Sequence, residues 1–419
     1  MRIERCDYIT APAGDAIHTH GQCYTAPAGE GMIEWVVHHA FDGKYYYTRK
    51  LYRRLSNDGG RTWSTHGPAY AADPSKPQSH ERLAGRHVLD ARSGLLVAIY
   101  SDWQIKSDQP QFASQSTSAS YRVHYEISRD QGNTWTAPRQ VIHRGPGFDA
   151  VHWMPGITYG RNGGYVESCP PAVLNDGTIV VGMVVAPLDA GGKLYRPGGA
   201  GYWYNTVFLR GRWNTDRTAL EWESSAPLAV ATDVSSVGIC EPDLVGLGGD
   251  RLFATMRCQG DRGRGIASSR QAALSADGGR TWTTPSPLTY DDGGPVYVPA
   301  AYSTFLRSPR TGKIYWFANI LDHPVCAQYP RCPLSMAEFD PQRLCLIRDS
   351  VQVVQGLPPG APPCTNELPT TDEECGRQYT NFGAYVDRQS GEMVILVSEM
   401  PKSTWREFTS DSIQIRIGD

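Results

Sequence analysis

Short apolar segments recur along this chain, each bordered by a turn that contains glycine. In most of them hydrophobic residues alternate with polar ones or form a brief run, and no segment keeps the spacing of an amphipathic helix. The pattern therefore predicts short antiparallel strands and an all-β fold. The clearest predicted strands are residues 45–55, 94–100, 121–127, 178–185, 251–256, 270–274, 313–319 and 392–399.

The sequence Ser-x-Asp-x-Gly-x-Thr-Trp occurs three times, at residues 56–63, 128–135 and 275–282. Aspartate and glycine favour a tight hairpin turn, because the carboxylate accepts local N–H groups and glycine tolerates positive φ. Threonine then begins the next strand, and tryptophan packs between neighbouring sheets. The three aspartates lie 72 and 147 residues apart. This spacing indicates a unit of about 70 residues, with one copy lost near residues 204–222.

Repeated antiparallel strands with one Trp-Gly turn per unit predict a β-propeller. The 419 residues, with 43 glycines, 30 prolines and 11 tryptophans, suit a closed, loop-rich β architecture better than a helical one. We expect one propeller domain over residues 1–419, with an insertion at residues 355–378 before the last blade.

The repeated sequence resembles the Asp-box, or BNR repeat, and the chain resembles the sialidase (neuraminidase) superfamily. This resemblance covers most of the chain and implies a six-bladed β-propeller with four-stranded antiparallel blades. It gives the box a structural role on the outer rim, so the chemistry has to be argued from other residues.

Three further segments resemble sialidase motifs, and two of them supply arginines. Glu241 and Arg257 stand at the two ends of a strand–turn–strand segment, where the resemblance implies a catalytic base and a substrate ligand. A buried ion pair between blades is the structural alternative for these two residues. Arg331, in residues 316–340, corresponds to another substrate-binding arginine.

The third segment, residues 377–400, resembles the family's Tyr-Ser-x-Leu segment and the apolar strand that follows it. The resemblance implies that Tyr379 is the nucleophile and that Glu399 closes the strand. Arg377 is a second candidate for the arginine position of Arg331, because it stands two residues before Tyr379. A structural role is the alternative for Tyr379, because the chain contains 22 tyrosines.

These residue types suit one reaction. Guanidinium groups hold the carboxylate of a nonulosonic acid through planar, bidentate hydrogen bonds. That charge repels a carboxylate nucleophile, and sialidases use a tyrosine instead. A free phenol has a pKa of about 10, so a partnering carboxylate must take its proton. A separate acid protonates the leaving oxygen, and water then hydrolyses the glycosyl-enzyme.

The first blade departs from the family pattern, because no arginine lies between Arg5 and Arg49. The position of the missing arginine falls near His20, with His18 and Gln22 beside it. These side chains can hydrogen-bond an anion or a hydroxyl, although less strongly than a guanidinium.

The loop at residues 38–50 contains Asp42 as its only carboxylate. Asp42 is therefore the candidate general acid, and an ordinary Asp-Gly turn is the alternative. His38 and His39 open the loop and are candidate pocket residues. No convincing set of ligands accompanies these histidines, so neither a metal nor a cofactor is expected.

Other segments are expected to shape the pocket. Residues 148–171 are aromatic and suit a sugar-stacking surface, residues 187–205 read as a mobile loop over the same face, and the insertion overhangs the site. Cysteines occur as two close pairs, which are consistent with one or two disulfides. These pairs are Cys326 with Cys332 and Cys364 with Cys375.

The formal net charge of −3 at pH 7 and the pI of about 6.4 give no reason to expect nucleic acid or an anionic membrane as partner. No apolar run approaches the roughly 18 residues that span a bilayer. No hydrophobic segment follows the first basic residues, so no signal peptide is visible. A leader removed earlier would make the protein secreted or periplasmic, and otherwise it is expected in the cytoplasm.

Together these features predict an exo-acting, retaining glycoside hydrolase of sialidase type that releases a terminal acidic sugar from a glycan. The missing first-blade arginine favours an altered nonulosonic or related keto-acid sugar. One alternative is a propeller that acts on arabinose- or uronate-type sugars, as an exo-glycosidase or a lyase, with first-blade histidines. Another is a non-catalytic glycan-binding propeller, which has no need for Glu241, Arg257, Arg331 and Tyr379 together.

Overall fold

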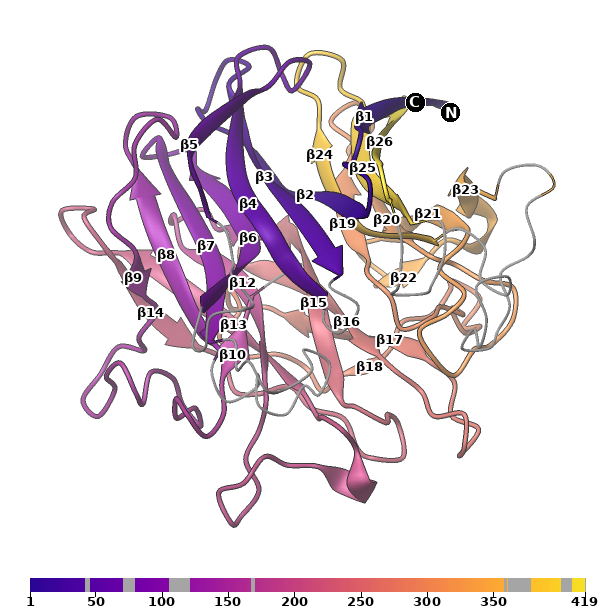
Figure 1. Cartoon of the computed structure of the whole chain (residues 1–419). Helices are drawn as coiled ribbons and strands as arrows, with labels where there is room; N and C mark the ends of the chain where they lie inside the picture. The colour runs from indigo at the N-terminus through magenta and orange to yellow at the C-terminus, as the bar shows by residue number, and fades with distance from the viewer. Residues whose placement is uncertain are drawn as a thin grey trace.

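The computed structural model describes residues 1–41, 46–70, 80–104, 121–166, 170–357, 360, 378–400 and 409–418. Through these residues the strands form six antiparallel sheets arranged in a ring, which is a six-bladed β-propeller (Figure 1). The predicted fold class is therefore confirmed. The candidate residues Asp42 and Arg377 and the cysteines Cys364 and Cys375 lie outside the described residues.

Each of the first three blades begins with an inner strand near the axis and ends with an outer strand at the rim. In chain order their strands are β2 (Asp15–Tyr24), β3 (Met32–Phe41), β4 (Tyr46–Ser56) and β5 (Ser64–Tyr70); β6 (His80–Asp90), β7 (Leu95–Gln104), β8 (Arg122–Ser128) and β9 (Arg139–Gln140); and β10 (Gly164–Tyr165), β11 (Ala172–Val173), β12 (Ile179–Val185), β13 (Asn205–Trp213) and β14 (Leu220–Ser224).

The other three blades follow the same plan, and the last one takes its outer strand from the N-terminus. Their strands are β15 (Ile239–Gly248), β16 (Arg251–Cys258), β17 (Ser269–Ser275) and β18 (Ser286–Pro287); β19 (Thr304–Arg307), β20 (Ile314–Ala318), β21 (Leu334–Asp340), β22 (Cys345–Leu346) and β23 (Gln352–Gln355); and β24 (Gln378–Val386), β25 (Met393–Met400), β26 (Ser412–Gly418) and β1 (Arg2–Ile9). Two short 3-10 turns are η2 (Pro197–Gly199) and η3 (Arg348–Ser350).

The predicted strand segments all fall on observed strands, because their apolar residues fill the spaces between blades. One large cluster of buried residues runs through β7, β8, β12, β13, β16 and β17, and includes Val97, Val180, Phe208 and Leu252. The inner strands contact one another around the axis. The ring is therefore held by apolar packing between sheets whose hydrogen bonds run within each sheet.

The register defines two faces of the ring. The first residues of the inner strands lie opposite the last residues of the second strands, as in the pairs Asp15–Ala40, Ile239–Cys258 and Gln378–Met400. We call this side the start face. The opposite side is the turn face, where Tyr24 pairs with Met32 and Met32 with Ser56. The Ser-x-Asp turns therefore lie on the turn face, between the third and fourth strands.

The three repeated turns have the same hydrogen bonds. The Ser56 hydroxyl accepts the N–H of Gly60 at 2.9 Å, and the Asp58 carboxylate accepts the N–H of Thr62 at 2.8 Å. Residues 128–135 and 275–282 repeat both bonds within 0.1 Å. Each tryptophan packs against the preceding blade, as when Trp282 stacks on Phe208 at 4.0 Å between ring centroids. The predicted structural role of this sequence is consistent with that geometry.

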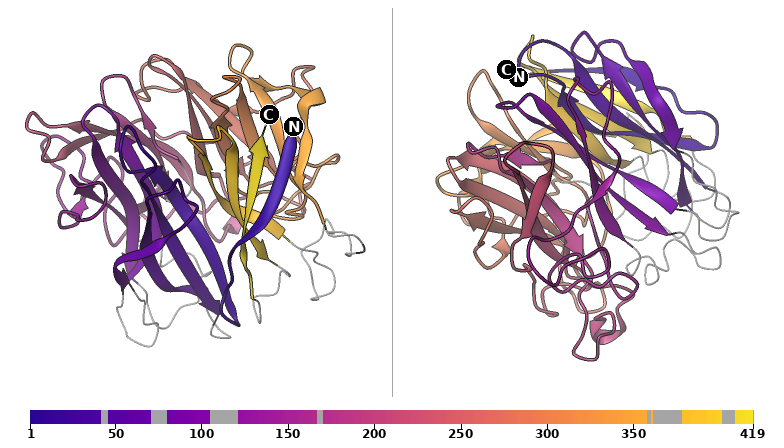
Figure 2. Two further views of the ribbon diagram at one scale, coloured as in Figure 1. Left: turned by 90° about the horizontal axis from the view of Figure 1, so that it is seen from above. Right: turned by 90° about the vertical axis from the view of Figure 1, so that its left-hand side faces the viewer.

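The two termini close the ring. Strand β1 pairs with β26 from Arg2–Gly418 to Ile9–Ser412, and the N- and C-termini lie side by side (Figures 1 and 2). The eight residues of β1 thus complete the last blade.

The proposed close cysteine pair does not form a disulfide. Cys326 and Cys332 are both thiols, because Cys332 is buried in the core of the last two blades while Cys326 lies in a half-exposed loop. Among the described residues, no helix has the length and apolar composition that crossing a membrane requires.

Candidate functional site

Glu241 and Arg257 meet at the start face as a direct ion pair. Cys240 pairs with Arg257 across β15 and β16, and the register then shifts before Asp243. This bulge holds Glu241 at φ 45° and turns its carboxylate onto Nη1 of Arg257. Burial lowers the pKa of the Arg257 guanidinium, but the charge and hydrogen bond of Glu241, together with Cys240 and Tyr202, outweigh burial and raise this pKa above its ordinary value.

Arg331 interacts electrostatically with this pair. Its Nε donates to the carbonyl of Gln328 at 3.0 Å, and its guanidinium lies 5.2 Å from the centroid of the Tyr329 ring. Burial lowers the pKa of Arg331, and the positive charge of Arg257 lowers it further, while Tyr329 and Glu241 oppose the shift. Two arginines from different blades therefore both interact with the Glu241 carboxylate.

Tyr202 belongs to the same region, although the sequence did not single it out. Burial raises the pKa of its phenol, which also interacts with Arg257, Arg331 and Glu241. Tyr202 stands in the aromatic segment 187–205 that was expected to form a loop over this face. The only sequence signal for it was that aromatic, glycine-rich composition.

Tyr379 is joined to Arg331 through the main chain. Its N–H donates to the carbonyl of Arg331 at 2.9 Å, and its own carbonyl accepts from Nδ2 of Asn319 at 3.1 Å. The side chain is fully buried within the core of the last two blades. Glu399 is its register partner across β24 and β25. The structure thus brings the Tyr379 and Arg331 segments together.

Three of the first-blade histidines form a cluster at the start of β2 and the end of β3. The ring centroid of His18 lies 6.1 Å from that of His20 and 5.0 Å from that of His39. The Nδ1 atom of His18 lies 2.8 Å from the hydroxyl of Ser398. Burial lowers the pKa of His18 to about 4 and holds those of His20 and His39 well below the usual range. The cluster is therefore uncharged at neutral pH.

His38, the neighbour of His39 in sequence, has further contacts of its own. His38 has Nε2 at 3.4 Å from the Tyr52 hydroxyl and Nδ1 at 3.9 Å from an Asp15 oxygen. In the part of the chain that the structure describes, no three His, Cys, Asp or Glu side chains are arranged to hold a metal ion.

Gln22 follows His20 across an irregularity in β2. The register of β2 shifts between His20 and Cys23, and this irregularity breaks the alternation of side chains. Gln22 donates through Nε2 to Glu34 at 3.0 Å. This bond joins β2 to β3 within the first blade.

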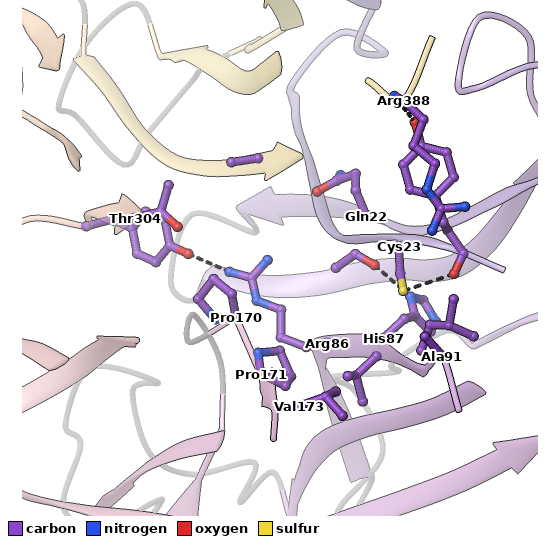
Figure 3. Close-up of a pocket in the computed structure, with 16 residues that line it drawn as sticks. Gln22, Cys23, Arg86, His87, Ala91, Pro170, Pro171, Val173, Thr304 and Arg388 are labelled. Atoms are coloured by element: carbon purple, nitrogen blue, oxygen red, sulfur yellow. Dashed lines mark hydrogen bonds between the residues drawn. The ribbon is translucent and has the colours of Figure 1, made fainter. Parts of the chain in front are cut away.

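Gln22 also lines a cavity of about 370 Å³ on the axis toward the turn face (Figure 3). Arg86 crosses the axis above this cavity and donates to the Tyr302 hydroxyl at 2.5 Å. The positive charge of Arg86 also contributes to the low pKa of His20. The Arg86–Tyr302 pair thus lies between the histidine cluster and the cavity.

Fold and geometry together define a six-bladed propeller whose start face carries a paired arginine–carboxylate site. No family model and no curated protein matches the sequence. Among solved structures, the chain is similar to a protein of unknown function from Dyadobacter fermentans, with 13% identity, TM-score 0.58 and 99% of each chain covered.

Two enzymes share this fold. The sialidase of Trypanosoma rangeli is 12% identical with TM-score 0.56, and the match covers 99% of this chain and 59% of the sialidase. The chain therefore spans about three fifths of that enzyme's length. An α-L-arabinofuranosidase from Fusarium graminearum is 12% identical with TM-score 0.53, with coverage of 98% and 97%. At these identities the likeness establishes the fold and leaves the activity to be argued from the site.

Proposed function

We propose that this protein is an exo-acting, retaining glycoside hydrolase that releases a terminal acidic sugar. The observation that carries the proposal is the mutual interaction of Arg257, Arg331 and Glu241, next to the main-chain bond between Arg331 and Tyr379. A propeller that only scaffolds gains nothing from two neighbouring guanidinium groups that share one carboxylate. A substrate carboxylate compensates both of them.

Arg257 and Arg331 bind the carboxylate of the sugar in this proposal. The substrate then competes with Glu241 for Arg257. Once that partner is shared, Arg257 holds the Glu241 carboxylate less tightly, and the carboxylate is free to accept a proton. Substrate binding therefore turns Glu241 from an ion-pair partner into a base.

Tyr379 is the proposed nucleophile, which requires the sugar to reach its buried side chain. Its oxygen attacks the anomeric carbon while Glu241 takes the phenol proton, and the bond to the leaving oxygen breaks. An acid supplies the proton to that oxygen, and Asp42 keeps this role from the sequence alone. Water then attacks the anomeric carbon, the tyrosyl–sugar bond breaks, and the phenol recovers its proton. The three repeated turns resemble the Asp-box and support the sialidase-type assignment.

The test is Tyr379→Phe, assayed with a panel of aryl nonulosonides. Loss of the nucleophile lowers kcat by at least about 10³-fold. Tyr385→Phe is the matched control, because Tyr385 lies on the same strand and its buried hydroxyl has no hydrogen-bond partner among the described residues. Undiminished turnover by Tyr379→Phe contradicts the nucleophile assignment.

A second candidate follows from the uncharged histidine cluster. His20 stands near the place where the sialidase pattern has its first arginine, and it supplies no positive charge there. An arabinose-type or uronate-linked sugar is the substrate in this case, with a neutral imidazole as base. Product analysis separates the two, since elimination leaves an unsaturated sugar that absorbs in the near ultraviolet and hydrolysis does not.

A further inference from the structure

A row of four tyrosines leads away from the arginine pair. The ring centroid of Tyr202 lies 5.1 Å from that of Tyr204, Tyr204 lies 5.9 Å from Tyr165, and Tyr165 lies 4.9 Å from Tyr121. We call these four residues the tyrosine row. All four side chains are half-buried, whereas core rings such as Phe208 and Trp222 are fully buried.

The register places the row on the start face. Tyr165 pairs with Val184 at the end of β12, and Tyr204 directly precedes Asn205, the partner of Val185. Tyr121 directly precedes β8, whose first residue pairs with Asp102 near the end of β7. The row therefore runs from the second blade across the third on the same side as Glu241.

The inner end of the row reaches the proposed catalytic region. Tyr202 interacts with both Arg257 and Arg331. Beyond Tyr202 the row contains only uncharged phenols. The half-buried rings of such a surface offer apolar faces for stacking, which match the CH faces of uncharged sugars.

We infer that the tyrosine row binds the part of the glycan beyond the scissile bond, as a line of sites for uncharged sugar residues. The inference rests on the proposed function, and it narrows the substrate class to an acidic sugar at the end of a neutral oligosaccharide. The spacing of the rings is comparable to the length of one sugar unit, so successive sugars can contact successive tyrosines.

The test compares kcat/KM for a nonulosonyl-lactose trisaccharide with kcat/KM for the aryl nonulosonide. The ratio of the two falls about three- to tenfold in Tyr165→Ala and in Tyr121→Ala, because only the trisaccharide reaches these rings. Tyr195→Ala is the matched control and keeps the wild-type ratio. Tyr195 belongs to the same loop as Tyr202 but packs on Trp203 outside the row, and its exposure is 37%.

Equilibrium binding of the trisaccharide, measured by calorimetry, separates this inference from the proposed function. Weaker binding by Tyr165→Ala supports the row even where the wild-type protein cleaves no glycoside. Unchanged ratios in a protein that hydrolyses both substrates overturn the row and leave the hydrolase intact. A wild-type protein that does not bind the trisaccharide also overturns the row. Tyr165→Leu, which keeps more bulk, replaces Tyr165→Ala if the alanine variant does not fold.

Discussion

At the scale of single residues, Glu241 is the most constrained side chain of the candidate site. It has a positive φ of 45°, a conformation that costs a non-glycine residue about 1–2 kcal/mol. Arg257 holds its carboxylate, and the buried Arg270 donates to its carbonyl at 3.4 Å and to the carbonyl of Ala301. Local strain that neighbouring side chains maintain is typical of a functional position.

Arg270→Lys tests whether this support positions Glu241. A lysine cannot reach both carbonyls with one planar group, so we expect kcat to fall about tenfold or more and the free energy of unfolding to fall by about 1–3 kcal/mol. Arg210→Lys is the matched control, because Arg210 is equally buried and bonds the carbonyl of Gly278 at 2.8 Å, far from the site. A similar loss of stability with unchanged kcat in both variants contradicts a positioning role for Arg270.

The buried histidines make stability depend on pH. The pKa of His18 is lowered by burial from its ordinary value of 6.5 to about 4, so the unfolded chain binds a proton first as the pH falls. The stabilisation is therefore complete above pH 6.5 and is lost between pH 6.5 and 4. His20 and His39 shift in the same direction.

We expect His18→Asn to reduce this loss by up to about 3 kcal/mol, since each pKa unit corresponds to about 1.4 kcal/mol. Asparagine can keep a bond to Ser398 without titrating. The measurement is the free energy of unfolding in urea at pH 7 and at pH 4.5. His152→Asn, at an exposed position, keeps the wild-type dependence. If the free energy of unfolding of His18→Asn falls with pH as steeply as that of the wild type, His18 is not the source of the pH dependence.

At the scale of elements, the Ser-x-Asp turn is a self-contained unit. In the second blade, Asp130 accepts the N–H of Thr134 at 2.8 Å and its hydroxyl at 2.6 Å, and Ser128 donates to it at 2.9 Å. The third blade has a different turn at the same place, in which Asn214 accepts the N–H of Thr218 at 2.9 Å. The repeated turn therefore depends on the carboxylate of one aspartate. In the turn of the third blade, Asn214 and Asp216 both bond to Thr218.

Asp130→Ala is therefore expected to lower the free energy of unfolding by about 2 kcal/mol, because several bonds to a charged group are lost together. Asp216→Ala, in the turn of the third blade, is expected to lower it by less than Asp130→Ala does, since Asn214 still holds Thr218. Urea denaturation measures both values. If Asp130→Ala and Asp216→Ala lower the free energy of unfolding equally, the two turns do not differ in their dependence on the aspartate.

The elements also explain which parts could be predicted from the sequence. Glu241 and Arg257 are separated by one tight hairpin, so their meeting follows from local pattern. The Arg331–Tyr379 bond joins segments far apart in sequence, and only the family resemblance indicated it. Arg270 and Tyr202 were missed because their contacts depend on side-chain direction across blades. The irregularity of β2 between His20 and Cys23 could not be predicted, because nothing in the local sequence marks it.

At the scale of the whole molecule, closure of the ring depends on β1. The repeat spacing predicted blades but could not show that the first strand completes the last blade. Register pairs from Arg2–Gly418 to Ile9–Ser412 provide that closure. Each blade of a propeller packs against both of its neighbours. If β1 separates from β26, the last blade can detach, and apolar surface is then exposed on both of its sides. The β1–β26 ladder should therefore limit the stability of the entire ring.

A covalent link across this ladder tests the idea. Cys6 lies directly opposite Gln414, and its Sγ is 3.6 Å from Oε1 of that residue. Opposite residues in antiparallel strands have Cα atoms about 4.5–5.5 Å apart, which lies within the range of about 4.4–6.8 Å that a disulfide requires. Gln414→Cys can therefore form a disulfide with Cys6 without moving the backbone.

We expect oxidised Gln414→Cys to unfold at a higher temperature than its reduced form. The free energy of unfolding should rise by several kcal/mol, up to about 5, because the disulfide closes nearly the whole chain into one loop. Thermal unfolding with and without a thiol reductant measures the difference. The double variant Cys6→Ser with Gln414→Cys is the control and should show no response to reductant. If the disulfide forms and the melting temperature stays the same, unfolding begins elsewhere in the ring, and closure by β1 does not limit its stability.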